Sequence, residues 1–180
     1  MAHKRDGGRG WRALFDTLDE SKGYAYLLSI GCTDITFIKT GDKKTPDLGA
    51  SLDGNRVLCE VKTINVSQDE AERRELIAKG PVPANITCQT TTEMLAKVSA
   101  TLAHAVAQLD AEDPQRLAHR IVFTVLNFDD WVGHYQVQYI AQLDAHLQAN
   151  PVAGTGLVFC PARNLFEHRF TMQSATVVEI

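Results

Sequence analysis

The chain has 180 residues, of which 44% are hydrophobic and 22% are charged, the size and composition of one globular domain with a buried core. It has no run of about 18 apolar residues and no secretory signal at its polar start, so we expect a cytoplasmic protein with no membrane partner. The formal net charge of −4 excludes a protein that coats nucleic acid through its overall field, so any contact with nucleic acid must be local.

A basic segment opens the chain. We expect residues 1–10 to form a flexible tail and residues 11–180 to form a single domain. As a flexible arm, the segment can reach nucleic-acid phosphates, or it can merely keep the chain soluble. The basic residues in question are Lys4, Arg5, Arg9 and Arg12.

The first half of the domain reads as a helix, a strand and a hairpin. Apolar residues recur at helical spacing from Trp11, which predicts one helix that ends at Gly31. Residues 34–39 alternate with period two and predict a strand. Two extended segments, about 47–52 and 56–64, flank Asp53-Gly54-Asn55, whose residues tolerate the positive φ values of a tight turn.

The second half alternates helices with strands, after a charged excursion at 67–79. An apolar stripe with Gln108 among the residues of its polar face predicts a helix over about 93–109. Further segments are predicted as a central strand at 120–127, a helix at 136–149, and weaker strands at 156–160 and 175–179. This order predicts an α/β domain with a mixed central sheet flanked by helices.

Glu60 and Lys62 share one face of the second hairpin strand, because side chains alternate along an extended chain. Charged groups amid Val, Leu, Cys and Ile are costly to bury unless they are paired or bind a metal. Counting outward from the hairpin turn places Asp47 nearly opposite Glu60. Two carboxylates and a lysine at one point suit Mg²⁺, with Mn²⁺ as a substitute, and such a site can hydrolyse phosphodiesters.

Pro46-Asp47, a gap that spans a hairpin, and Glu60-Val61-Lys62 resemble the PD-(D/E)XK signature of restriction endonucleases and Holliday junction resolvases. The resemblance covers roughly residues 10–64, and it implies a restriction endonuclease-like fold. It also implies a metal-dependent nuclease, with DNA as its expected partner and with a homodimer or a partner subunit for cutting two strands.

The resemblance assigns a role to each matching residue. Asp47 and Glu60 would bind the metal together with the main-chain carbonyl of Val61, and Lys62 would orient or activate the attacking water. The family often carries a glutamate on its first helix, and Glu20 stands at a matching distance before Gly31. Asp16 and Asp19 are alternatives for that position.

Other chemically capable residues receive structural interpretations. The four cysteines follow no zinc spacing and are expected to be reduced, with Cys59 in the core. The six histidines follow no metal-binding spacing either, and we assign them no role. Asp129-Asp130 is interpreted as a turn, and Lys97 as a solvated partner of Glu93 or a residue that approaches phosphate.

Two classes of function therefore compete. The first is a Mg²⁺-dependent nuclease with Asp47, Glu60, Lys62 and Glu20 in its site. The second is a non-catalytic or partner-dependent module of the same fold that binds nucleic acid or protein, which the acidic net charge favours.

Overall fold

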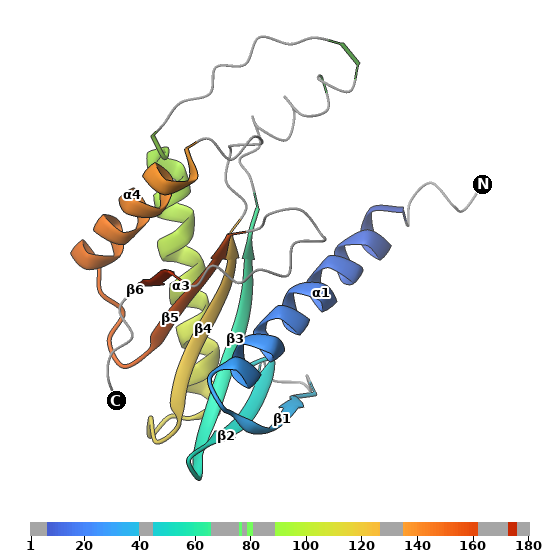
Figure 1. The fold of residues 1–180 in the computed structure, drawn as a ribbon, viewed down its shortest axis with the longest axis vertical. Helices are drawn as coiled ribbons and strands as arrows, with labels where there is room; N and C mark the ends of the chain where they lie inside the picture. Colours follow the sequence, from blue (N-terminus) through green and yellow to red (C-terminus); the bar gives the residue numbers. More distant parts are fainter. Residues whose placement is uncertain are drawn as a thin grey trace.

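A computed structural model of the chain describes residues 7–39, 45–65, 76, 79–80, 89–126, 135–161 and 173–175. Within these residues, the first helix is followed by three strands, after which helices and strands alternate as far as the fifth strand (Figure 1). In chain order they are α1 (Gly7–Ser29), β1 (Thr33–Phe37), β2 (Leu48–Leu52), β3 (Asn55–Ile64), α3 (Thr92–Glu112), β4 (His119–Leu126), α4 (Gln136–Ala149), β5 (Gly156–Pro161) and β6 (Gln173–Ala175).

The strands form one mixed sheet in the order β1-β2-β3-β4-β5-β6. Neighbours β1 to β3 pair antiparallel, β3 to β5 pair parallel, and β6 pairs antiparallel with β5. The two parallel connections pass through α3 and α4, as parallel strands require a crossover. The predicted α/β architecture is thus confirmed, and the restriction endonuclease-like topology stays a prediction.

Element boundaries differ from the predicted ones mainly near the two ends of the chain. Helix α1 begins at Gly7, so residues 7–10, predicted as flexible tail, lie in a helix. Strand β6 covers Gln173–Ala175, where 175–179 was expected. The charged excursion predicted at 67–79 and the turn at Asp129-Asp130 lie almost entirely outside the described residues.

The predicted glycine stop of α1 is confirmed by its hydrogen bonds. The N–H of Cys32 donates to the carbonyl of Leu27 at 3.0 Å, and that of Gly31 donates to the carbonyl of Leu28 at 3.1 Å. Gly31 has a φ of 89°, which glycine adopts without the steric cost that a Cβ would bring. These two bonds form a Schellman motif, which ends the helix and turns the chain into β1.

The hairpin that was predicted from Asp53-Gly54-Asn55 is also confirmed. Asp53 and Gly54 have φ values of 51° and 81°, and Leu52 pairs with Asn55 across a two-residue loop. Positive φ at both loop positions matches the twist of the flanking strands. The turn therefore sets the register of β2 against β3, and with it the position of every side chain farther along the hairpin.

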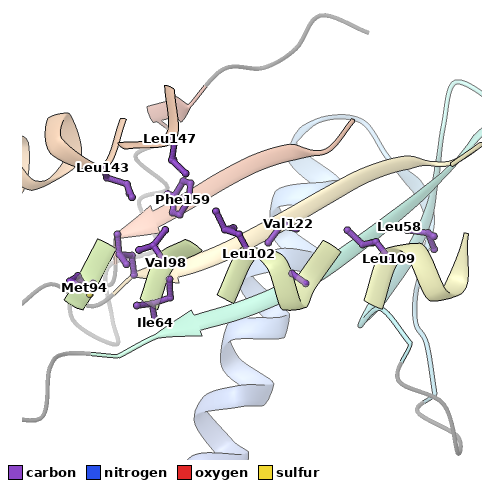
Figure 2. Close-up of a cluster of buried hydrophobic side chains, with 12 residues drawn as sticks. Leu58, Ile64, Met94, Val98, Leu102, Leu109, Val122, Leu143, Leu147 and Phe159 are labelled. Atoms are coloured by element: carbon purple, nitrogen blue, oxygen red, sulfur yellow. The ribbon is translucent and has the colours of Figure 1, made fainter. Parts of the chain in front are cut away.

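Two hydrophobic clusters cover the two faces of the sheet. Figure 2 shows the first, in which α3 and α4 pack on β3, β4 and β5 through residues that include Leu58, Leu102, Val122, Leu143 and Phe159. The second lies under α1 and contains Leu27, Leu48, Val57, Cys59, Val61 and Phe123, among others. Strand β3 contributes alternate residues to both clusters, so it is buried on both faces.

Helix α1 lies close against the sheet at Gly23. A Cβ atom at this position would lie 2.7 Å from Cγ2 of Val61 and 3.3 Å from Cδ1 of Leu48. Both neighbours are buried, so the helix would have to move away from the sheet to accept a methyl group. The absence of a side chain at Gly23 thus allows α1 to rest directly on β3.

We expect Gly23→Ala to lower the free energy of unfolding by about 1–2 kcal/mol. Overpacking costs roughly 1–3 kcal/mol, and a contact of 2.7 Å belongs in the upper half of that range, so about 1–2 kcal/mol remains after the better helix propensity of alanine offsets about 1. Gly49→Ala is a matched control, because its Cβ would make only ordinary contacts, at 3.5 Å from Ile38. Urea denaturation measures both variants, and a Gly23→Ala protein as stable as the native one would contradict the tight contact.

No helix among the described residues is long and apolar enough to cross a membrane.

Candidate functional site

The hairpin brings three of the four predicted site residues together at its open end, namely Asp47, Glu60 and Lys62. Leu48 pairs with Cys59, so Asp47 comes one position farther out, beside Glu60. The main-chain N–H of Val61 donates to Oδ2 of Asp47 at 2.7 Å. The ammonium of Lys62 donates to Oε1 of Glu60. The proximity that was predicted by counting from the turn is therefore confirmed.

Glu60 and Lys62 point toward the face of the sheet that carries α3. Leu58 and Ile64, which share their strand parity, belong to the cluster under α3 and α4. Val57, Cys59 and Val61 have the opposite parity and pack under α1. Strand β3 thus supplies the site on one face, and Val57, Cys59 and Val61 form an apolar layer behind it.

Glu60 is completely buried, yet only one of its carboxylate oxygens has a donor. Oε1 accepts from Lys62, while Oε2 has no hydrogen-bond donor among the described residues. Burial, together with the nearby charge of Asp47, raises the pKa of Glu60 to about 7, although Lys62 acts in the opposite direction. A buried carboxylate oxygen that faces another carboxylate requires a proton or a cation.

Asp47 lies in a similar electrostatic environment to that of Glu60. Burial raises the pKa of Asp47, and the N–H of Val61 and the charge of Lys62 oppose that rise. Asp47 and Glu60 together carry two potential negative charges against the single positive charge of Lys62. The site therefore has room for one more positive charge, in the form of a proton or a bound cation.

Gln108 on α3 completes this cluster, and its prediction as part of a polar outer face was wrong. Lys62 donates to Oε1 of Gln108 at 2.8 Å, and Nε2 of Gln108 donates to the carbonyl of Thr45 at 3.4 Å. Gln108 directly precedes Leu109, which is fully buried. Gln108 lies at the margin of the apolar stripe of α3, and this place in the sequence pattern could have indicated that its long side chain reaches the sheet.

Of the acidic residues that were considered on the first helix, Asp19 contacts β3 in the structure. It is buried, accepts from Oγ1 of Thr63 at 2.6 Å, and pairs with Lys22 at 2.6 Å. Thr63 has the parity of the α1 face, so this contact lies on the side of β3 opposite Lys62. Glu20 is half-buried, and its role in the site stays a prediction. The side chain of Asp16, the other alternative, lies outside the described residues.

Several other predictions fall on undescribed parts of the chain. Lys4 and Arg5 lie outside the described residues, and so do the side chains of Arg9 and Arg12, whose backbone belongs to α1. The proposed metal contact of the Val61 carbonyl stays a prediction.

Two side chains outside the site form contacts that the sequence did not suggest. Nε2 of His146, one of the histidines to which no role was assigned, lies 2.8 Å from Oγ of Ser99 and joins α4 to α3. Lys97 donates to the carbonyl of Asn65 at 2.9 Å, just beyond β3. Both contacts connect structural elements, and neither reaches Glu60.

As a chemical arrangement, the site offers a buried carboxylate, Glu60, and a half-buried one, Asp47, with an ammonium group beside them. Among the described residues, no group of three or more His, Cys, Asp or Glu side chains could hold a metal ion. Mg²⁺ commonly uses one or two carboxylates and takes its other ligands from water and phosphate. The unpaired Oε2 of Glu60, close to Asp47, fits that mode of binding.

Searches of known protein families, curated proteins and solved structures found no match to this chain. The case for a function therefore rests on the residues of the site and their geometry.

Proposed function

We propose that the protein is a Mg²⁺-dependent nuclease that hydrolyses phosphodiester bonds of DNA. The observation that carries the proposal is the buried Oε2 of Glu60, which has no donor among the described residues, in a carboxylate that lies near Asp47 and has Lys62 on its other oxygen. Such an arrangement is costly for a folded protein and finds compensation when a cation binds.

Each residue has a role that follows from its contacts. Asp47 and Glu60 would hold the ion, and the N–H of Val61 orients the carboxylate of Asp47. A bound Mg²⁺ would polarise the phosphodiester and lower the pKa of a coordinated water. Lys62 can orient the attacking water and offset the negative charge that develops on the phosphate.

The partial exposure of Lys62 supports this role. Its side chain is 25% exposed, whereas that of Glu60 is 1% exposed, so solvent reaches Lys62 but not Glu60. Glu60 and Gln108 take two of its three N–H groups among the described residues, and the third can be offered to a ligand. A substrate phosphate that approaches from solvent would meet the ammonium before the carboxylates.

A cleavage panel tests the proposal. Linear, circular, single-stranded and branched DNA, together with RNA, are incubated with the protein in Mg²⁺, Mn²⁺ or EDTA. We expect metal-dependent cleavage of DNA that Glu60→Ala abolishes. Glu112→Ala is a matched control, because it removes a carboxylate that pairs with Arg56 at 2.6 Å, away from the site.

Two other results, one from the panel and one from a separate measurement of Mn²⁺ binding, would change the proposed function. Cleavage of RNA but not of DNA would support the proposed hydrolysis of phosphodiesters and would change the proposed substrate to RNA. Binding of Mn²⁺ by a folded protein that cleaves nothing would favour the non-catalytic or partner-dependent module, an alternative consistent with the net charge of −4. Absence of both cleavage and metal binding would refute the proposed function.

A further inference from the structure

Gln108 connects β3 to the segment that precedes β2 and contains Asp47. Its Oε1 accepts from the ammonium of Lys62 on β3 at 2.8 Å. Its Nε2 donates to the carbonyl of Thr45 at 3.4 Å, in the segment that leads through Pro46 to Asp47. One amide from α3 is therefore bonded both to Lys62 and to the backbone two residues before Asp47.

The chemistry of the partners allows only one orientation of this amide. An ammonium group has donors alone, so it must face the oxygen of Gln108, and a carbonyl accepts alone, so it must face the nitrogen. A carboxylate at this position could still accept from Lys62, but it would lose the bond to Thr45 and add a third acid beside Asp47 and Glu60. Glutamine thus meets both needs without adding charge.

We infer that Gln108 is a positioning residue that holds the ammonium of Lys62 in place for the reaction, an inference that rests on the proposed function of the site. A lysine side chain has several rotatable bonds and loses considerable rotamer entropy when it is fixed. Glu60 alone would leave the ammonium free to swing around one oxygen. The second acceptor restrains that motion and leaves the third N–H directed toward a ligand.

This inference predicts that Gln108→Ala lowers kcat and leaves KM nearly unchanged. A hydrogen bond to a charged group contributes enough that its loss should lower kcat by about ten- to a hundredfold. KM should change little, and so should the affinity for Mn²⁺, because Asp47 and Glu60 keep their carboxylates. Gln108→Asn should behave like Gln108→Ala, because the shorter side chain cannot span from Lys62 to Thr45.

A double-mutant cycle separates positioning from general loss of structure. If Gln108 acts through Lys62, Gln108→Ala should lower kcat in the native background and have no further effect in Lys62→Ala. An equal loss of kcat in both backgrounds would overturn the inference. Gln142→Ala is the matched control, because it removes another half-buried amide, which accepts from Thr90 at 2.7 Å on the α4 side. We expect its kcat to stay at the native value.

A second measurement does not depend on activity. The ammonium resonance of Lys62 can be followed in nitrogen-15 NMR spectra of the folded protein, assigned by its disappearance in Lys62→Ala. We expect Gln108→Ala to broaden or shift this resonance and Gln142→Ala to leave it unchanged. An unaltered Lys62 resonance in Gln108→Ala would refute the positioning role. A perturbed resonance in a protein that never cleaves nucleic acid would uphold the positioning of Lys62 and refute the nuclease proposal alone.

Discussion

Replacing Lys62 with alanine is expected to lower kcat for DNA cleavage by a factor on the order of 10² to 10⁴, the usual scale for one catalytic group. The affinity for Mn²⁺ should stay the same or become tighter. The ammonium competes with a metal ion for the charge of Glu60, to which it is hydrogen-bonded. Removing it leaves two carboxylates whose attraction for a cation has increased.

This separation of rate from metal binding identifies the role of Lys62. Steady-state cleavage gives kcat and KM, and calorimetry gives the Mn²⁺ affinity of the same preparation. Lys22→Ala is the matched control, because Lys22 also pairs with a buried carboxylate, that of Asp19, but on the α1 side of β3. Its kcat should stay within a few-fold of native. A native rate in Lys62→Ala would contradict the assignment, and a large loss of metal affinity would make Lys62 a structural support of the site.

The core of the site could be predicted because it depends on local chain geometry. Asp53 and Gly54 specify a two-residue turn, and a turn of known length fixes the register of both strands. The alternation of side chains then places Glu60 and Lys62 on one face. Each step uses only residues within the hairpin, so no tertiary information is needed to bring Asp47 to Glu60.

The contribution of the helices could not be predicted in the same way. Periodicity separates the buried face of α3 from its exposed face, but Gln108 lies at the margin between them, and only the packing angle decides where its amide reaches. The same holds for α1, where Asp19 and Glu20 are adjacent in the sequence. The close approach at Gly23 sets the rotation that places Asp19 against Thr63.

Replacing Glu60 with glutamine is expected to stabilise the metal-free protein at pH 8 while it abolishes metal-dependent cleavage. Glutamine has nearly the shape of glutamate, its oxygen can still accept from Lys62, and its amide N–H₂ can donate to Asp47. A donor would thus take the place of Oε2, an acceptor for which the described residues provide no donor. Removing a buried charge that needs a cation should raise the free energy of unfolding.

The raised pKa of Glu60 determines the direction and the size of the expected change in the free energy of unfolding. The pKa of Glu60 is raised from its ordinary value of 4.5 to about 7, so the folded state holds the proton more tightly than the unfolded state. The associated stability is fully present below about pH 4.5 and is lost as the pH rises to about 7. A rise of this size corresponds to roughly 3 kcal/mol.

Urea denaturation at pH 5 and pH 8, in EDTA, measures the effect as a difference between the two proteins. Native and Glu60→Gln proteins should be close in stability at pH 5, and the variant should be more stable by about 2–3 kcal/mol at pH 8. The difference between the native and Glu60→Gln proteins removes the contribution to stability of every other group that titrates alike in the two proteins. Glu112→Gln, at a partly exposed ion pair, should differ from native by less than about 1 kcal/mol at either pH.

Adding Mg²⁺ distinguishes a cation site from a carboxylate pair that merely shares a proton. If Asp47 and Glu60 hold the ion, saturating Mg²⁺ at pH 8 should restore stability to the native protein by about 3 kcal/mol at a hundredfold excess over Kd, and leave Glu60→Gln unchanged. A stability difference that varies with pH but not with Mg²⁺ would mean that the buried pair is satisfied by a proton alone. In that case Glu60 would lose its place in the proposed mechanism, because a site that gains nothing from the cation cannot use it to activate water.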